Sequence, residues 1–241
     1  MALLDRTALR AAFLRDEPDD PGRLYERILR IGVVIAIAGA VVQTTSQLVN
    51  YFVFDLRVWN LEVDADNNAF AWASSVAQFA AAFACALLLI AGWWSARRLL
   101  ALSLILAFFS LDDIARFHEE IGSSVREDVF GLEIGYGRVI WPIVFSPLLA
   151  AAFILLWRFA EQAEKRAARY IQLGLVMLVL AIFAEASSAT FHVGQDADGT
   201  LADVLQVAVE ENLELAGWVL IASAMAATLC NTLVERGRTE S

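Results

Sequence analysis

The chain has 241 residues, 59% of them hydrophobic, and its mean hydropathy is +0.59. This apolar content lies well above the roughly half-apolar composition of soluble domains and predicts an integral membrane protein. The net charge of −10 argues against a nucleic-acid partner, which would require clustered Lys and Arg.

The first 26 residues form a charged segment that we expect to lie in the cytoplasm. Residues 1–23 lack a continuous apolar core and a small-residue cleavage site, so they do not resemble a signal peptide. Leu3, Phe13 and Leu14 fit one side of a short helix at the membrane surface, whereas a frayed tail explains the same composition. Both interpretations remain open.

Six apolar windows follow, and each is long enough to cross a hydrocarbon core of about 30 Å as a helix. They span about residues 28–50, 69–94, 97–118, 138–160, 168–192 and 204–231. Alternating period-two patterning is absent, which argues against a membrane β-barrel. The sequence therefore predicts an all-α polytopic protein, with a six-helix transmembrane domain over 27–231 and a cytoplasmic tail over 232–241.

The distribution of basic residues predicts the orientation of this bundle. With a cytoplasmic N-terminus, 14 of the 18 Lys and Arg residues lie in inner segments, and only Arg57, Arg116, Arg126 and Arg138 lie outside. The positive-inside rule then places both termini in the cytoplasm of a bacterium, with the chain in its inner membrane. Of the 28 acidic residues, 18 fall on the outer side, which would attract cations.

Acidic and histidine residues gather within or beside three of the apolar windows. An ionised carboxylate at membrane depth costs several kcal/mol unless it is paired, hydrated or metal-bound, so such residues are functional candidates. Because alternate helices run in the same direction, we expect the three groups to meet at one outer level, above an apolar inner half. The candidate residues are Asp112, Asp113, His118, Glu185, His192, Glu210, Glu211 and Glu214.

These side chains include the ligand types that bind Zn²⁺, Mn²⁺ or non-haem iron. The expected ligand set of a divalent metal is Asp112, Asp113, His118, Glu185, His192, Glu211 and Glu214. On an ideal helix, His118 falls outside the arc of its acidic neighbours. Either the helix breaks near Phe117, or His118 faces another neighbour. Alternatively, the acids form ion pairs with Arg116 and Arg138, or some are protonated.

Two resemblances accompany these residues. The string Ser110-Leu111-Asp112-Asp113 with His118-Glu119, followed by Glu210-Glu211 and Glu214, is similar to uncharacterised multi-pass bacterial membrane proteins with an SLD[DE]…HE and EExxE pattern. That resemblance implies no activity. Ser188-Ala-Thr-Phe-His192 resembles the Ser-x-x-x-His element of the CREST superfamily of membrane metal hydrolases. The chain lacks that superfamily's His-x-x-x-His pair and has one predicted span fewer than its usual seven.

Three function classes remain open at this point. A metal-dependent hydrolase of lipid-like substrates would use a metal-bound water, with Glu211 or Asp113 as general base. A cation or proton transporter or sensor would use the same acidic residues as its binding site. In a non-catalytic scaffold, the acids would serve only pairing and solubility. A haem held by His118 and His192 is a more distant fourth. Membrane lipid is the expected partner in every case, with a cation or lipid-like substrate in the first two.

Overall fold

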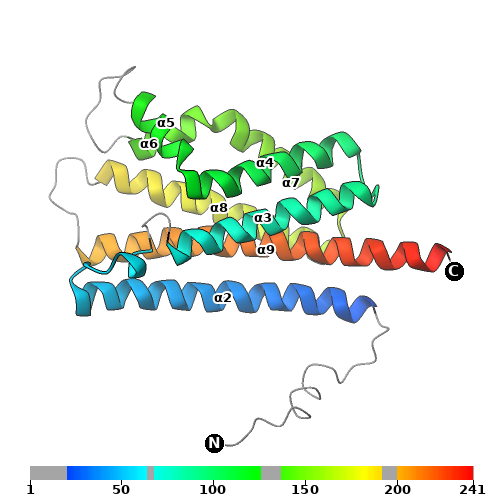
Figure 1. The fold of residues 1–241 in the computed structure, drawn as a ribbon, viewed down its shortest axis with the longest axis horizontal. Helices are drawn as coiled ribbons and strands as arrows, with labels where there is room; N and C mark the ends of the chain where they lie inside the picture. Colours follow the sequence, from blue (N-terminus) through cyan, green and yellow to red (C-terminus); the bar gives the residue numbers. More distant parts are fainter. Residues whose placement is uncertain (1–20, 64–67, 126–136, 192–199, 241) are drawn as a thin grey trace, which may run out of the picture.

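The computed structural model describes residues 21–63, 68–125, 137–191 and 200–240, and the fold there is all-α (Figure 1). The expected surface helix at the N-terminus and the metal-ligand candidate His192 lie outside these residues. The elements are α2 (Pro21–Phe54), the 3-10 turn η1 (Trp59–Leu61), α3 (Ala69–Ile90), α4 (Ala96–Ala115), α5 (Phe117–Val125), α6 (Gly137–Val144), α7 (Ser146–Gln162), α8 (Lys165–Phe191) and α9 (Leu201–Glu240).

The long helices lie side by side along the long axis of the molecule and alternate in direction (Figure 1). Helix α9 is central and packs against α2, α3 and α8, while α4 packs against α3 and α7. The start of α2 and the end of α9 lie at the same end of the bundle (Figure 1). The short helices α5 and α6 contact each other at the opposite end.

Small residues allow α9 to approach its neighbours closely. A Cβ atom on Gly174 of α8 would lie 2.7 Å from the backbone oxygen of Gly217 on α9. A Cβ atom on Gly39 of α2 would lie 2.7 Å from a side-chain carbon of Leu215 on α9. Close backbone approach through glycine is a common way for helices to pack in a membrane, where apolar burial drives association less than it does in water.

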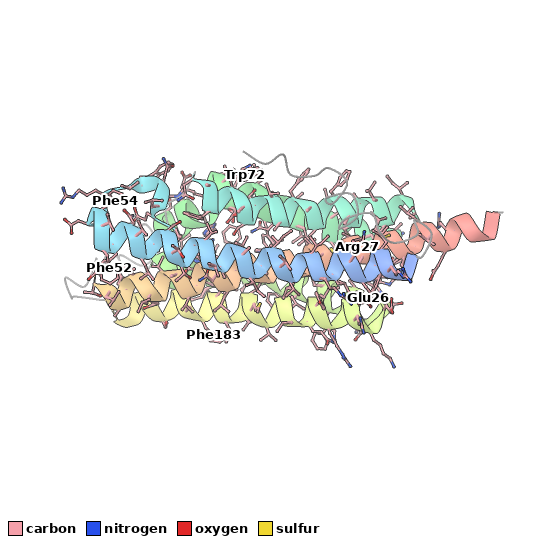
Figure 2. The ribbon with its side chains drawn as sticks, turned by 90° about the horizontal axis from the view of Figure 1, so that it is seen from below. Glu26, Arg27, Phe52, Phe54, Trp72 and Phe183 are labelled. Carbon is pink, nitrogen blue, oxygen red and sulfur yellow. The ribbon has the colours of Figure 1, made fainter. Side chains whose placement is uncertain are left out.

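The outer surface of the bundle is apolar. Phe52 on α2 is 67% exposed, Phe183 on α8 is 69% exposed and Trp72 on α3 is 62% exposed, and all three point away from the interior (Figure 2). Four of the described helices, namely α2, α3, α8 and α9, are long and apolar enough to cross a membrane. The expectation of a membrane protein is therefore supported for these four helices.

The helices of the other two predicted windows are not among these four. Helix α4 carries Arg97 and Arg98 near its start and Asp112 and Asp113 near its end, and it stops at Ala115 rather than continuing to residue 118. The window over 138–160 is divided into α6 and α7. Two prolines explain the division, since Pro142 lies inside α6, a second proline lies in the first turn of α7, and proline lacks the N–H that a continuous helix requires.

Candidate functional site

The break between α4 and α5 brings Asp112 and His118 together. Arg116, directly after α4, has a φ of 59° and a left-handed conformation, and α5 then starts at Phe117. The backbone N–H of His118 donates to Oδ1 of Asp112 at 2.9 Å, and Nδ1 of His118 lies 2.9 Å from Oδ2 of the same carboxylate. Of the two explanations that the sequence left open for His118, the structure shows the break near Phe117. A left-handed non-glycine residue costs about 1–2 kcal/mol, so the surrounding contacts must hold this turn in place.

A tryptophan of α6 holds a further carboxylate, and a second tryptophan lines the same cavity. Nε1 of Trp141 on α6 donates to Oε1 of Glu185 on α8 at 2.7 Å. The Trp141 ring also packs edge-on against His118, with 4.8 Å between the ring centroids. On α9, Trp218 lies one turn after Glu214 and lines the same cavity. An indole N–H is a neutral donor, so the bond from Trp141 positions the Glu185 carboxylate without neutralising it.

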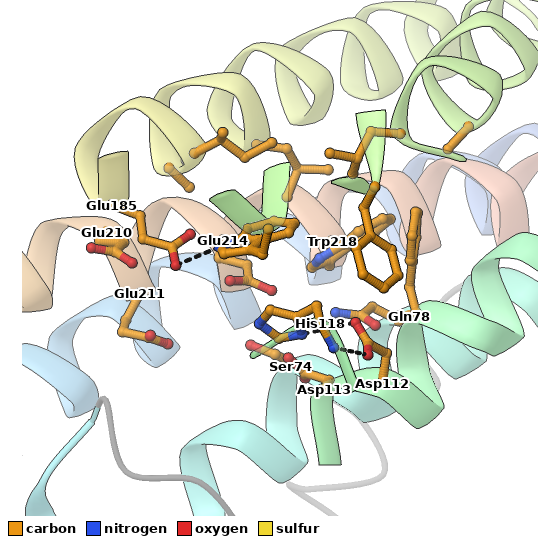
Figure 3. A pocket seen from close by; sticks show the side chains of 18 of the residues that line it. Ser74, Gln78, Asp112, Asp113, His118, Glu185, Glu210, Glu211, Glu214 and Trp218 are labelled. Atoms are coloured by element: carbon orange, nitrogen blue, oxygen red, sulfur yellow. Dashed lines mark hydrogen bonds and ion pairs between the residues drawn. The ribbon is translucent and has the colours of Figure 1, made fainter. Parts of the chain in front are cut away.

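These groups line one cavity of about 160 Å³ within the bundle (Figure 3). Helices α3, α4, α5, α6, α7, α8 and α9 all contribute to its lining. The charged lining residues are Asp112, Asp113, Glu185, Glu210, Glu211 and Glu214, with His118 beside them. The lining residues in the described part of the chain include no Lys or Arg.

The cavity is polar at its mouth and apolar in its depth. Along α9, Glu210, Glu214 and Trp218 follow one another at one-turn intervals, and the rise of a helix places the first and last about 12 Å apart. At the deeper end, α7 contributes Leu149, Ala152, Phe153 and Leu156, and α8 contributes Leu178, Ala181 and Ile182. Polar mouth residues therefore lie above an aromatic and aliphatic floor, as the sequence predicts.

Two polar atoms of α3 in the cavity wall have no hydrogen-bond partner among the described residues. Ser74 is 3% exposed and Gln78 is 2% exposed, and both side chains line the cavity (Figure 3). Oγ of Ser74 and Oε1 of Gln78 accept no hydrogen bond from any described residue. An unsatisfied buried polar atom costs about 1–3 kcal/mol, which is a reason to expect a ligand or water to complete these bonds.

The structure brings together most of the site residues predicted from the sequence. Six of the seven predicted metal ligands line this one cavity, and the seventh, His192, lies outside the described residues. No group of three His, Cys, Asp or Glu side chains in the described segments is arranged to hold a metal ion. The assigned roles, metal ligation for the set and general base for Glu211 or Asp113, therefore stay predictions.

Several cavity residues were not assigned a role from the sequence. Glu210, a candidate residue outside the expected ligand set, is 8% exposed and lines the cavity. Trp218 lies four residues after Glu214, and this one-turn spacing was the signal that could have identified it. No sequence pattern indicated that Trp141 would contact His118 and Glu185 together.

Comparisons with known proteins identify a family but no activity. No curated protein and no solved structure matches the chain. The family model described as a domain of unknown function, DUF8692, matches residues 28–228, which include every residue of the cavity. The chain belongs to the DUF8692 family.

Proposed function

We propose that this protein is an integral membrane protein that binds a cation in the acidic cavity. The observation that carries the proposal is the charge of the lining, where six carboxylates face one histidine and no Lys or Arg among the described lining residues. Carboxylates removed from bulk water need compensation by protons, donors or cations. Transport or sensing would use the same bound cation.

In the bacterial inner membrane, we place six crossings made by α2, α3, α4, α6 with α7, α8 and α9. Both termini then lie in the cytoplasm, and the cavity opens toward the outer side. The alternating helix directions support this arrangement (Figure 1). The basic residues support it as well, because Arg27, Arg97 and Arg166 all belong to the bundle end opposite the acidic cavity.

A divalent metal such as Zn²⁺, Mn²⁺ or iron is the second candidate, and one contact favours it. Metal-binding histidines commonly use their second ring nitrogen to contact a carboxylate, and Nδ1 of His118 contacts Asp112 in this way. Glu214 lies close enough for the charges of both residues to act on it. A hydrolase acting on a lipid-like substrate would require such a metal, with Glu211 or Asp113 as the general base.

Ligand-dependent stability tests the proposal. A cation that binds only the folded protein at 100 times its dissociation constant adds about 2.7 kcal/mol of stability. We expect the melting temperature of the purified protein to rise on addition of at least one of Zn²⁺, Mn²⁺ and methylammonium. The rise should be lost in Asp113→Asn and kept in Glu235→Gln, an exposed acid on α9 away from the cavity.

Elemental analysis of the same preparations separates the candidates. A stoichiometric metal whose removal by chelator lowers the melting temperature would support the metal candidate. The opposite result is protein that carries no metal and whose melting temperature does not change with any of the three cations. This result would contradict cation binding and favour the scaffold interpretation.

A further inference from the structure

The lower half of the cavity has a composition that a bare metal ion does not need. Below the acids, the wall consists of Trp218, Phe109, Phe145 and Phe153 with aliphatic neighbours. The Phe109 and Trp218 rings pack with 6.0 Å between their centroids. Aromatic rings attract organic cations through their negative faces, and apolar walls stabilise an apolar substituent by removing it from water.

Hydrogen-bond acceptors lie at the boundary between the two halves. Gln78, the deeper of the two α3 residues, presents the unpartnered acceptor Oε1 at 2% exposure. Ser74, one turn closer to the mouth, presents its unpartnered Oγ. Glu214 of α9 lines the same cavity as these two residues (Figure 3). An ammonium group has several N–H donors and a positive charge, so it can satisfy the acceptors and balance a carboxylate at the same position.

A second hollow lies behind the apolar wall. This groove of about 610 Å³ runs along α7 and α8 and is lined mainly by apolar side chains, including Ile154, Val176 and Leu180. Ile154 is 61% exposed, so this surface faces the surroundings of the bundle. Phe153 belongs to the lining of both hollows and therefore lies between them. The Phe153 side chain thus separates the apolar floor of the cavity from the apolar outer groove.

We propose that the ligand is an organic ammonium ion with an apolar substituent, an inference that rests on the proposed cation-binding function. Its ammonium group lies between Glu214 and Gln78, and its apolar substituent lies over the aromatic floor toward Phe153. The ammonium group then matches Glu214 and the unpartnered acceptor of Gln78, and the substituent matches the apolar floor.

A homologous series of probes tests this assignment. Binding of n-alkylammonium ions from methyl to hexyl is measured by calorimetry on the purified full-length protein, with n-alkanols of equal length as uncharged controls and Mn²⁺ and Zn²⁺ as inorganic cations. Affinity should rise about fourfold for each methylene that enters the apolar floor. The alkanols should bind at least tenfold more weakly than the matching ammonium ions.

Three variants locate the binding position. Glu214→Gln removes the charge, and Gln78→Met replaces the unpartnered acceptor with an apolar chain of similar length. Each should lower hexylammonium affinity at least tenfold, while Glu235→Gln leaves it unchanged. Because Gln78→Met removes an unsatisfied buried atom, it should keep or raise the melting temperature, so lost binding cannot be attributed to misfolding.

The outcomes separate the two proposals. Binding of Mn²⁺, Zn²⁺ or methylammonium without any gain from chain length would overturn the organic ligand and leave cation binding intact. Alkanols that bind as tightly as the ammonium ions, or no binding by any probe, would overturn both. Unchanged hexylammonium affinity in Gln78→Met would overturn the assigned position of the ammonium group.

Discussion

The contact between Asp112 and His118 should hold the turn between α4 and α5, and its removal should destabilise the protein. Asp112 is 7% exposed, and its two oxygens accept from the backbone N–H and contact Nδ1 of His118. A hydrogen bond to a charged group contributes about 1.5–3 kcal/mol, and part of this loss is recovered because His118 is only half-buried. We therefore expect Asp112→Ala to lower the free energy of unfolding by about 2–4 kcal/mol.

Asp112→Asn should cost about half as much. An asparagine oxygen still accepts from the His118 backbone N–H, whereas its amide group cannot accept from the ring. The measurement is the free energy of unfolding from SDS titrations in mixed micelles, followed by tryptophan fluorescence. Glu161→Ala is the control, since this exposed acid pairs only with Arg158 at the surface and should change stability by less than about 1 kcal/mol.

A double-mutant cycle with His118→Ala isolates the contact from the other effects of each substitution. We expect a coupling free energy of about 1–3 kcal/mol between the two positions. If the losses of Asp112→Ala and His118→Ala add to within about 0.5 kcal/mol, the two side chains do not support each other. The role assigned to the pair would then be wrong.

Three further predictions concern packing, the second carboxylate contact and topology. Gly174→Ala should lower the free energy of unfolding in SDS titrations by about 1–3 kcal/mol, because its Cβ would lie 2.7 Å from a backbone oxygen of α9. Gly237→Ala, with nothing within 4 Å of its Cβ, should be neutral or slightly stabilising. Equal effects of the two substitutions would refute the close approach. Trp141→Phe should lower the free energy of unfolding by about 1–3 kcal/mol and weaken cation binding, because Glu185 loses the N–H that donates to it at 2.7 Å. Calorimetry that shows unchanged cation affinity would contradict the part of Trp141 in the site. In cells, a cysteine at Asp55 should react with an impermeant thiol reagent from the outside, and one at Arg166 only after the membrane is permeabilised, with the reverse pattern contradicting the orientation.

Much of the site's composition could be predicted because helical geometry is regular. A constant rise and alternating helix directions bring Asp112, Glu185 and Glu211 to the same end of the bundle, whatever the details of packing. The same regularity predicted a polar mouth above an apolar floor. The misfit of His118 on an ideal helix indicated a break, although periodicity alone left two explanations open.

Details that depend on single backbone angles or on contacts between distant segments required the tertiary structure. The left-handed conformation of Arg116 redirects the chain and turns His118 toward Asp112, and no periodic pattern encodes such a turn. Trp141 reaches Glu185 across 44 residues of sequence, so only the packing of α6 against α8 makes this pair.

The sequence by itself therefore determined the helical membrane class and which residues share a level, since both follow from local hydrophobicity and helix geometry. The tertiary structure alone decided which of those residues meet. The unpartnered Oε1 of Gln78 shows the difference, because its lack of a partner follows from the position of every neighbouring helix rather than from any residue near it in the chain.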